Sequence, residues 1–228
     1  MGNIGFFTKC PEPEFPHPHI PERTLTLLCQ VIEEAWHLLK QHPPDNFDIN
    51  TALEDTITEI LVEILEDTLR QKAVIPGFNT QLFGSVERDV KRTNYNKTHP
   101  DKMPDILFHL NREHLPIKSS QDGLYVECKP IDKNHSLRSA YCEKGVIRFV
   151  NGDYAWAMQE ALMIGYLRNK KTYSDLSPHL SENQYNKSKF AINKANKTCV
   201  SNHNRHFTCY TKAKPGSIKV HHLWLKTY

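Results

Sequence analysis

Two acidic side chains and a lysine lie in two short segments in which apolar and polar residues alternate. This alternation can bring the three side chains onto one face of a sheet. Pro104-Asp105 opens the segment 104–110, and Glu127 and Lys129 lie in the segment 124–129. Alternate residues of a strand share a face, so Asp105 lies opposite the apolar face of the first strand. Glu127 and Lys129 likewise lie opposite the apolar face of the second. If the strands pair, two carboxylates and an ammonium group meet on one patch.

Such a patch suits a divalent cation and a phosphate. Two carboxylates and a nearby backbone carbonyl supply the oxygen ligands that Mg²⁺ prefers. A lysine beside them can orient an attacking water and offset the charge that develops on a phosphate. The alternative is an ordinary surface ion pair between Glu127 and Lys129, with Asp105 in a turn. The alternation of residues leaves both interpretations open.

The order Pro104-Asp105, 21 intervening residues, then Glu127-Cys128-Lys129 resembles the signature of the PD-(D/E)XK nuclease superfamily, the restriction-endonuclease-like fold. The resemblance covers about residues 50–167 and implies an α-β-β-β-α-β core. It implies that Asp105 and Glu127 bind one or two Mg²⁺ or Mn²⁺ ions and that the Cys128 carbonyl also binds metal. Lys129 would position the water that attacks phosphorus, while the metal ions stabilise the attacking and leaving oxygens.

Many members of that superfamily add a carboxylate from the first core helix, and Glu54 is the candidate here. At roughly 100° per residue, Glu54 falls within the apolar stripe of its helix, near Ile57 and Leu61. Thr51-Ala52-Leu53-Glu54 also reads as a capping box, in which Glu54 would accept from the Thr51 backbone N–H. Both interpretations stand, and the resemblance favours a metal ligand.

The hydrophobic pattern predicts a mixed α/β (α+β) fold. The proline-rich residues 1–22 form an extended segment, and one domain follows over 23–228. Its core spans about 50–167, with a basic elaboration over 168–228. Three- and four-residue spacing predicts two amphipathic helices, and alternation predicts four strands. The helices are expected at 23–41 and 51–72, and the strands at 80–86, 104–110, 124–129 and 162–167.

The remaining segments are predicted from weaker patterns. Residues 145–150 are ambiguous, and Asp153 reads as the N-cap of a short helix that ends at Glu160. The polar stretch 170–204 is expected to form a helix and loops. A terminal hairpin is expected from 206–212 and 218–225, which flank Lys214-Pro215-Gly216.

The charge is divided unevenly along the chain. Residues 1–164 carry a net charge of −7 and residues 165–228 carry +10. Basic residues interleaved with aromatic ones in the second part indicate contact with a phosphate backbone, although a solvated basic tail is the alternative. The candidates for nucleic-acid contact are Lys187, Lys189, Lys194, Lys197 and Arg205. Asp132, Lys133 and His135, after the second strand, are weaker candidates for a phosphate contact.

Zinc is a less favoured alternative. Cys199, His203, His206 and Cys209 are zinc-type ligands, but the odd separation of His206 and Cys209 puts them on opposite sides of a strand. The cysteines lack a C-x-x-C pair and no signal-peptide pattern opens the chain, so a cytoplasmic protein without membrane contact is expected.

The predicted function is metal-dependent hydrolysis of nucleic acid, with double-stranded DNA as the expected partner. A restriction-like or phage-defence effector is the expected setting, as a homodimer or within a larger defence complex. Two alternatives remain open. One is a non-catalytic nucleic-acid-binding or assembly subunit with the same fold, and the other is an RNA-directed nuclease.

Overall fold

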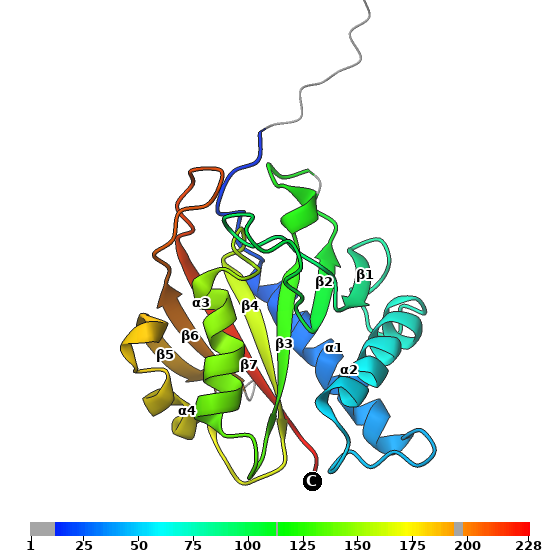
Figure 1. Ribbon diagram of the computed structural model, residues 1–228. Helices are drawn as coiled ribbons and strands as arrows, with labels where there is room; N and C mark the ends of the chain where they lie inside the picture. Colours follow the sequence, from blue (N-terminus) through cyan, green and yellow to red (C-terminus); the bar gives the residue numbers. More distant parts are fainter. Residues whose placement is uncertain (1–11, 113, 194–197) are drawn as a thin grey trace, which may run out of the picture.

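The computed structural model describes residues 12–112, 114–193 and 198–228. These residues form a seven-stranded sheet in the order β1-β2-β3-β4-β7-β6-β5 (Figure 1). The strand bounds are β1 Phe83–Arg88, β2 Ile106–Leu110, β3 Leu124–Ile131, β4 Glu160–Leu167, β5 Lys187–Asn193, β6 Thr198–Asn204 and β7 Ser217–Lys226. The β3–β4 and β4–β7 pairs are parallel, and the other pairs are antiparallel. The expected mixed α/β class is confirmed.

Helices pack on the sheet from both sides. In Figure 1, α1 passes behind the central strands, and the helix that ends in α3 crosses in front of them. The longer helical segments are α1 Glu22–Gln41, α2 Glu54–Glu63 with its π-helical continuation η1 Ile64–Arg70, η3 Leu137–Val146 with α3 Ile147–Asn151, and α4 Tyr173–His179. Two short 3₁₀ turns are η2 Ser119–Gln121 and η4 Asn183–Tyr185.

The amphipathic stripe of α1 forms one side of the core. Leu28, Ile32 and Leu39 are fully buried there. Trp36 stacks on Tyr166 of β4 with ring centroids 5.5 Å apart, and its indole N–H donates to the Lys226 carbonyl at 2.9 Å. The helix predicted over 23–41 is therefore confirmed, because its apolar face anchors the chain to β4 and β7 together.

The central strands β3 and β4 are buried along their whole length. Parallel strands covered by helices on both faces are normally apolar throughout. On β3, Glu127 and Lys129 interrupt that pattern, and the Glu127 residue has no solvent exposure at all. Charges so deep in a sheet need partners, and the site below supplies them.

Several expected boundaries and elements are wrong. The second helix begins at Glu54, not at 51, and the segment 153–160 is not a helix before β4. The left-handed φ of 52° at Ala155 is incompatible with a right-handed helix. The polar stretch 170–204 contains the expected helix, as α4, but it also contains β5 at the edge of the sheet and β6 beside it. Polar and charged residues suit an edge strand such as β5, and the polar composition concealed β6 as well. The helix at 145–151 resolves the ambiguous segment.

The terminal hairpin forms with different strands from those expected. Residues 206–212 belong to the connection between β6 and β7, and β6 lies earlier in the chain, at Thr198–Asn204. β6 pairs antiparallel with β7, so residues 198–204, and not the expected residues 206–212, are the pairing partner of 218–225. The Arg205 guanidinium ties the connection down by donating to the carbonyls of Ala155, Met158, Pro215 and Gly216.

The expected extended N-terminal segment is confirmed for residues 12–21. It crosses the N-terminal end of β4, where His17 N–H donates to the Ala157 carbonyl at 2.7 Å. The Gln159 side chain donates to the His17 carbonyl at 2.7 Å, and the Ile20 N–H donates to Glu160 Oε2 at 3.0 Å. These bonds join the segment to the domain although it has no regular secondary structure.

Two further observations concern membrane-spanning helices and the state of the cysteines. Within the described ranges, the helices are too short or too polar to cross a membrane. Cys29, Cys128, Cys142, Cys199 and Cys209 are all free thiols.

Gly152 is expected to be sensitive to substitution. It ends α3 with a left-handed φ of 73°, and an added Cβ would lie 2.5 Å from the Phe207 ring. We expect Gly152→Ala to lower the free energy of unfolding by about 2–4 kcal/mol, because backbone strain and overpacking add. Gly216 is the matched control, since its φ is 66° but an added Cβ meets Pro16 only at 3.5 Å. Equal losses in urea unfolding would show that the Phe207 contact is unimportant.

Candidate functional site

The end of β2 positions the first acidic residue. The β2–β3 register stops at Ile106 opposite Val126, so the Cys128 N–H, two residues further along β3, has no backbone partner on β2. Asp105 fills that place, because its Oδ2 accepts from the Cys128 N–H at 2.6 Å. The carboxylate therefore extends the ladder by one side-chain bond and is held against β3.

Lys129 lies at the centre of the site, with four oxygen atoms around its Nζ. The distances are 2.6 Å to the Cys128 carbonyl, 2.7 Å to Glu54 Oε1, 3.0 Å to Glu127 Oε1 and 3.3 Å to Asp105 Oδ2. The side chains of these three carboxylates are 25%, 0% and 18% exposed, respectively. The structure thus brings together the four residues selected from the sequence and the Cys128 carbonyl.

Glu54 reaches the site from the first turn of α2. The capping alternative is not formed, because Leu53 occupies the N-cap position and no side chain bonds there. Ile57 and Leu61, which follow Glu54 on the same stripe, are fully buried. The inward orientation predicted for Glu54 is therefore confirmed, and its partner is Lys129. The positive end of the helix dipole also favours a carboxylate at this position.

Two residues that the sequence did not suggest hold the Glu127 carboxylate. Arg148 of α3 places a guanidinium nitrogen 2.9 Å from Glu127 Oε1, and the Tyr154 hydroxyl donates to Oε2. Tyr154 stacks on Tyr125, two residues before Glu127 on β3, with centroids 6.2 Å apart. The shared face of Tyr125 and Glu127 was visible from alternation. Arg148 and Tyr154 come from segments whose structure the sequence left ambiguous or misassigned.

Burial and mutual charge set the protonation of the site. Burial, reinforced by the Asp105 charge, raises the pKa of Glu127 to about 7. Burial also raises the pKa of Glu54, against the opposing effect of Lys129. For Lys129, burial opposes the charged form, but Glu127, Asp105 and Glu54 together hold its pKa above the ordinary value. Lys129 is therefore a cation at neutral pH and is unsuited to act as a base.

The donor set suits a hard divalent cation. Carboxylate and carbonyl oxygens are the ligands of Mg²⁺ and Mn²⁺, and here they converge on one point. Lys129 Nζ occupies that point at distances typical of ammonium hydrogen bonds rather than of Mg–O bonds of about 2.1 Å. Within the described ranges, no three His, Cys, Asp or Glu side chains already stand in a metal-binding arrangement. Binding therefore requires the ammonium group to move aside.

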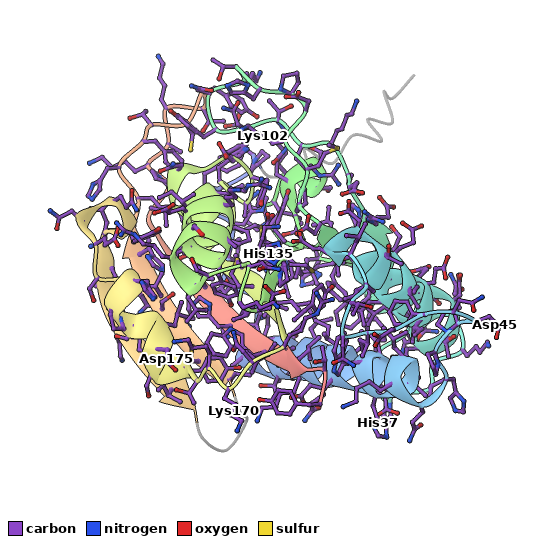
Figure 2. The ribbon with its side chains drawn as sticks, turned by 60° about the horizontal axis from the view of Figure 1, so that its bottom comes forward. His37, Asp45, Lys102, His135, Lys170 and Asp175 are labelled. Atoms are coloured by element: carbon purple, nitrogen blue, oxygen red, sulfur yellow. The ribbon has the colours of Figure 1, made fainter. Side chains whose placement is uncertain are left out.

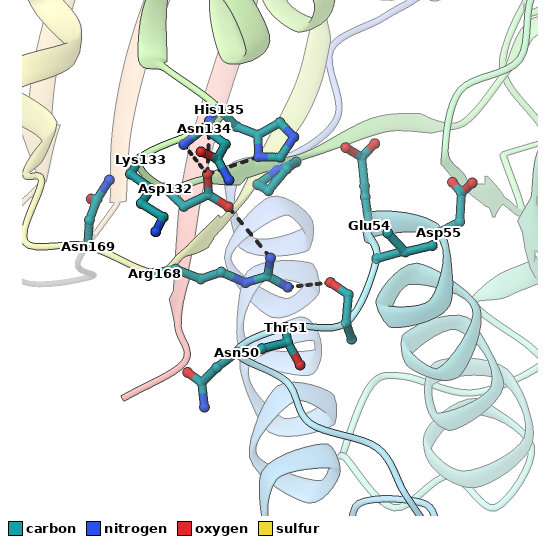
Figure 3. Close-up of a pocket in the computed structure, with 13 residues that line it drawn as sticks. Asn50, Thr51, Glu54, Asp55, Asp132, Lys133, Asn134, His135, Arg168 and Asn169 are labelled. Carbon is teal, nitrogen blue, oxygen red and sulfur yellow. Dashed lines mark hydrogen bonds and ion pairs between the residues drawn. The ribbon is translucent and has the colours of Figure 1, made fainter.

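A cavity of about 850 Å³ opens beside Glu54. The start of α2 forms one wall and the segment after β3 forms the other (Figure 3). Arg168 spans it, donating to the Ile49 and Ala52 carbonyls and lying 3.6 Å from Asp132 Oδ2. His135 also binds Asp132, and Figure 2 shows it between α2 and the helix that ends in α3. The Asp132 carboxylate is thus already paired with His135 and Arg168, while Lys133 is exposed and lines the cavity.

Of the three described residues predicted to contact nucleic acid, Arg205 is buried, while Lys187 and Lys189 lie on β5. Arg205 is 6% exposed and its guanidinium is bound to backbone carbonyls, so that prediction is wrong. Lys187 bonds the Ser177 carbonyl and Ser181 Oγ, and Lys189 is exposed on the same strand. β5 stands four strand spacings, about 19 Å, from β3. Lys194 and Lys197 lie outside the described residues.

The four zinc-type residues have separate environments. Cys199 is fully buried in the core, Cys209 belongs to a small cluster with Trp156, and His206 is exposed. His203 is fully buried and its Nδ1 lies 2.7 Å from the Tyr185 carbonyl. In the part of the chain described, these residues are not grouped to hold an ion.

His203 belongs to a buried chain of hydrogen bonds across β6 and β7. Its Nε2 lies 2.7 Å from Ser201 Oγ, which lies 2.8 Å from His222 Nε2. His222 Nδ1 is 3.0 Å from the Tyr141 hydroxyl, and Trp224 Nε1 donates to that hydroxyl at 3.2 Å. These histidines are structural rather than ligands.

Comparison with known proteins does not identify a relative. No protein-family model matches the chain. Neither the curated proteins nor the solved structures contain a significant match.

Proposed function

We propose that this chain is a metal-dependent nuclease that hydrolyses phosphodiester bonds of nucleic acid, with double-stranded DNA as the first candidate substrate. The convergence of Asp105, Glu127, Glu54 and the Cys128 carbonyl on one point beside Lys129 carries the proposal. The order α2-β1-β2-β3, then the helix ending in α3, then β4, agrees with the core of the PD-(D/E)XK superfamily that the sequence resembles and supports it.

The residues divide the chemistry among them. Asp105, Glu127, Glu54 and the Cys128 carbonyl would hold Mg²⁺ or Mn²⁺, which when bound polarises a phosphate and favours a hydroxide nucleophile. Lys129, charged at neutral pH, pairs with the anionic phosphate and orients the attacking water. Arg148 and Tyr154 hold the Glu127 carboxylate in one orientation. They act through Glu127 and are positioning residues.

A second candidate has its own supporting observation. Lys129 and Arg148 already neutralise the carboxylates, as they would in a non-catalytic nucleic-acid-binding or assembly subunit. An RNA-directed nuclease would use the same residues. A cytoplasmic restriction-like or phage-defence role, as a homodimer or in a larger complex, is part of the proposal and rests on analogy of fold alone.

Plasmid and RNA cleavage tests the proposal. The purified chain is incubated with supercoiled DNA or structured RNA in Mg²⁺, Mn²⁺ or EDTA. We expect cleavage that EDTA abolishes and that Glu127→Gln lowers by at least about 100-fold, because the main buried metal ligand loses its charge. Glu63→Gln is the matched control, since Glu63 is an exposed residue of α2. Cleavage that persists in EDTA or in Glu127→Gln would refute the mechanism. Binding without cleavage by the wild type would favour the second candidate.

A further inference from the structure

A second cavity, of about 460 Å³, lies among the loops near the N-terminal end of β3. Four basic side chains line it, and among the described residues no aspartate or glutamate does. We call this the basic pocket; its principal residues are Lys91, Arg92, Lys97, Lys118 and Gln121. Like charges that converge without a lining carboxylate repel one another, and a bound anion would relieve this.

Backbone bonds hold the walls of the basic pocket. The Arg92 N–H donates to the Lys102 carbonyl at 2.7 Å, and the Lys102 N–H donates to the Arg92 carbonyl at 3.1 Å. The Lys118 N–H donates to His17 Nε2 at 3.1 Å, and the Gln121 N–H donates to the Lys118 carbonyl at 2.8 Å. Figure 2 shows Lys102 at the upper side of the molecule in that view. The pocket is therefore built from fixed segments.

Two polar groups of the basic pocket have no hydrogen-bond partner in the part of the chain described. They are Arg92 Nε and the Gln121 side-chain oxygen. Gln121 is 6% exposed and lines the cavity. Its amide oxygen and nitrogen exchange places by a simple rotation, so it can present two N–H donors. A buried N–H without an acceptor is costly, and an anion in the cavity would supply one.

Nearby carboxylates are already occupied. Asp122, adjacent to Gln121, binds the Arg112 guanidinium and lies 3.5 Å from His17 Nδ1. Glu87, whose carboxylate also feels the Arg92 charge, accepts from the Ser85 hydroxyl and lies 3.4 Å from His109. Neither lines the cavity. Lys118 donates to the Tyr210 hydroxyl and Lys97 lies over the Tyr210 ring, 4.1 Å from its centroid. These contacts bring no negative charge, so the positive charge of the basic pocket is left for an outside partner.

The basic pocket connects to the candidate site on the same face of β3. The Arg92 charge acts on the Tyr125 hydroxyl, Tyr125 stacks on Tyr154, and Tyr154 bonds Glu127. Tyr125 and Glu127 are two residues apart on the strand, a separation of about 7 Å. An anion held beyond Tyr125 is consequently a different group from one held at Lys129.

We propose that the basic pocket binds a phosphate of the nucleic-acid substrate other than the one that is cleaved. This inference rests on the proposed function. Half-buried Arg92 and buried Gln121 act as the donors, since a guanidinium matches a phosphate in a bidentate manner. Lys91, Lys97 and Lys118 supply charge at the rim. The pocket thereby fixes how the strand lies over Glu127 and Lys129.

Binding in the absence of cleavage tests this inference. Fluorescence anisotropy in EDTA measures the affinity of Glu127→Gln protein for a labelled DNA duplex over a range of salt. We expect the added triple substitution Lys91→Gln, Lys97→Gln, Lys118→Gln to weaken binding at least about 10-fold and to flatten the salt dependence. The triple Lys40→Gln, Lys72→Gln, Lys170→Gln removes the same charge from exposed positions elsewhere and serves as control.

A neutral methylphosphonate, moved along one strand of the duplex, locates the contact. We expect one position where it weakens binding by the parent protein but not by the basic-pocket triple variant. Equal effects of the two triple variants, or no such position, would overturn the inference. These binding results do not depend on cleavage. If only the basic-pocket variant loses affinity and the wild type does not cleave, the proposed nuclease activity is refuted but the phosphate-binding role of the basic pocket stands.

Discussion

Lys129→Met is expected to reduce metal-dependent cleavage by about 1000-fold and to make the protein depend on divalent cations for stability. The substitution keeps the unbranched side chain but removes the cation that three carboxylates and a carbonyl surround. Breaking a buried ion pair from one side costs about 3–5 kcal/mol, because the remaining charges are left uncompensated. The Glu127 carboxylate then keeps the Arg148 guanidinium and the Tyr154 hydroxyl as partners, but Glu54 and Asp105 lose their shared cation.

The measurement is thermal unfolding in EDTA and in millimolar Mg²⁺ or Mn²⁺. In EDTA we expect Lys129→Met to melt well below the wild type, and divalent cations to raise its Tm more than that of the wild type, since the competing ammonium group is gone. Lys144→Ala, at an exposed position of η3, is the control. Unchanged cleavage, or an equal response of both proteins to the cations, would contradict the assignment of this point as the metal site.

Acid is expected to destabilise the fold through the buried histidines of β6 and β7. His203 and His222 belong to a chain of hydrogen bonds that runs from the Trp224 indole to the Tyr185 carbonyl. All of these hydrogen bonds can form while both histidines are neutral and each N–H or O–H donates once. Protonating His203 places a second proton between its Nε2 and the Ser201 hydroxyl, so the bond in which Ser201 donates to that nitrogen is lost. Burial lowers the pKa of His203 to about 4 and holds the pKa of His222 well below its ordinary value. The contribution of the neutral histidines to the free energy of unfolding is fully present above a pH of about 6.5, the pKa of histidine in the unfolded chain. It is lost as the pH falls toward 4.

For His203, the loss between pH 6.5 and pH 5 is about 2 kcal/mol. Glu127 acts in the opposite direction, because a carboxyl pKa raised to about 7 makes its protonation favour the folded state. The informative quantity is therefore the difference in unfolding free energy between pH 7.5 and pH 5.0, compared between wild type and His203→Gln. We expect the variant to lose about 2 kcal/mol less on acidification. His37→Gln, at an exposed residue of α1, should behave as wild type; identical behaviour of His203→Gln would exclude the effect.

Local patterns identified much of the site. Alternation placed Glu127 and Lys129 on one face, and helical spacing turned Glu54 inward; both depend on the positions of neighbouring residues along the chain. What alternation could not reveal is that Lys129 occupies the point where the oxygens converge. That depends on the distance between α2 and β3, which tertiary packing determines. Arg148 and Tyr154 were missed because they lie in the segments 145–150 and 153–160, whose structure the sequence left ambiguous or misassigned.

The same distinction explains the fold. The stripe of α1 and the apolar runs of β3 and β4 are strong local signals, and the elements form where expected. β5 is a polar strand at the edge of the sheet and β6 lies beside it; β6 pairs with β7 and β5 pairs with β6, and this pairing makes them strands. Arg205 lies in a basic part of the sequence, yet the surrounding carbonyls bury it. The composition of a segment shows how polar its residues are, whereas the exposure of each side chain depends on contacts with residues far away in the sequence.

The central place of β7 has a consequence for how the protein is made. β7 is the last strand along the chain, yet it lies between β4 and β6 and joins β1–β4 to the β5–β6 pair. Until the ribosome has released residues 217–226, the two parts of the sheet have no strand connecting them. β4 then exposes an apolar edge beside the candidate site, and such an edge can pair with another chain. The sheet can therefore be completed only after residues 217–226 have left the ribosome.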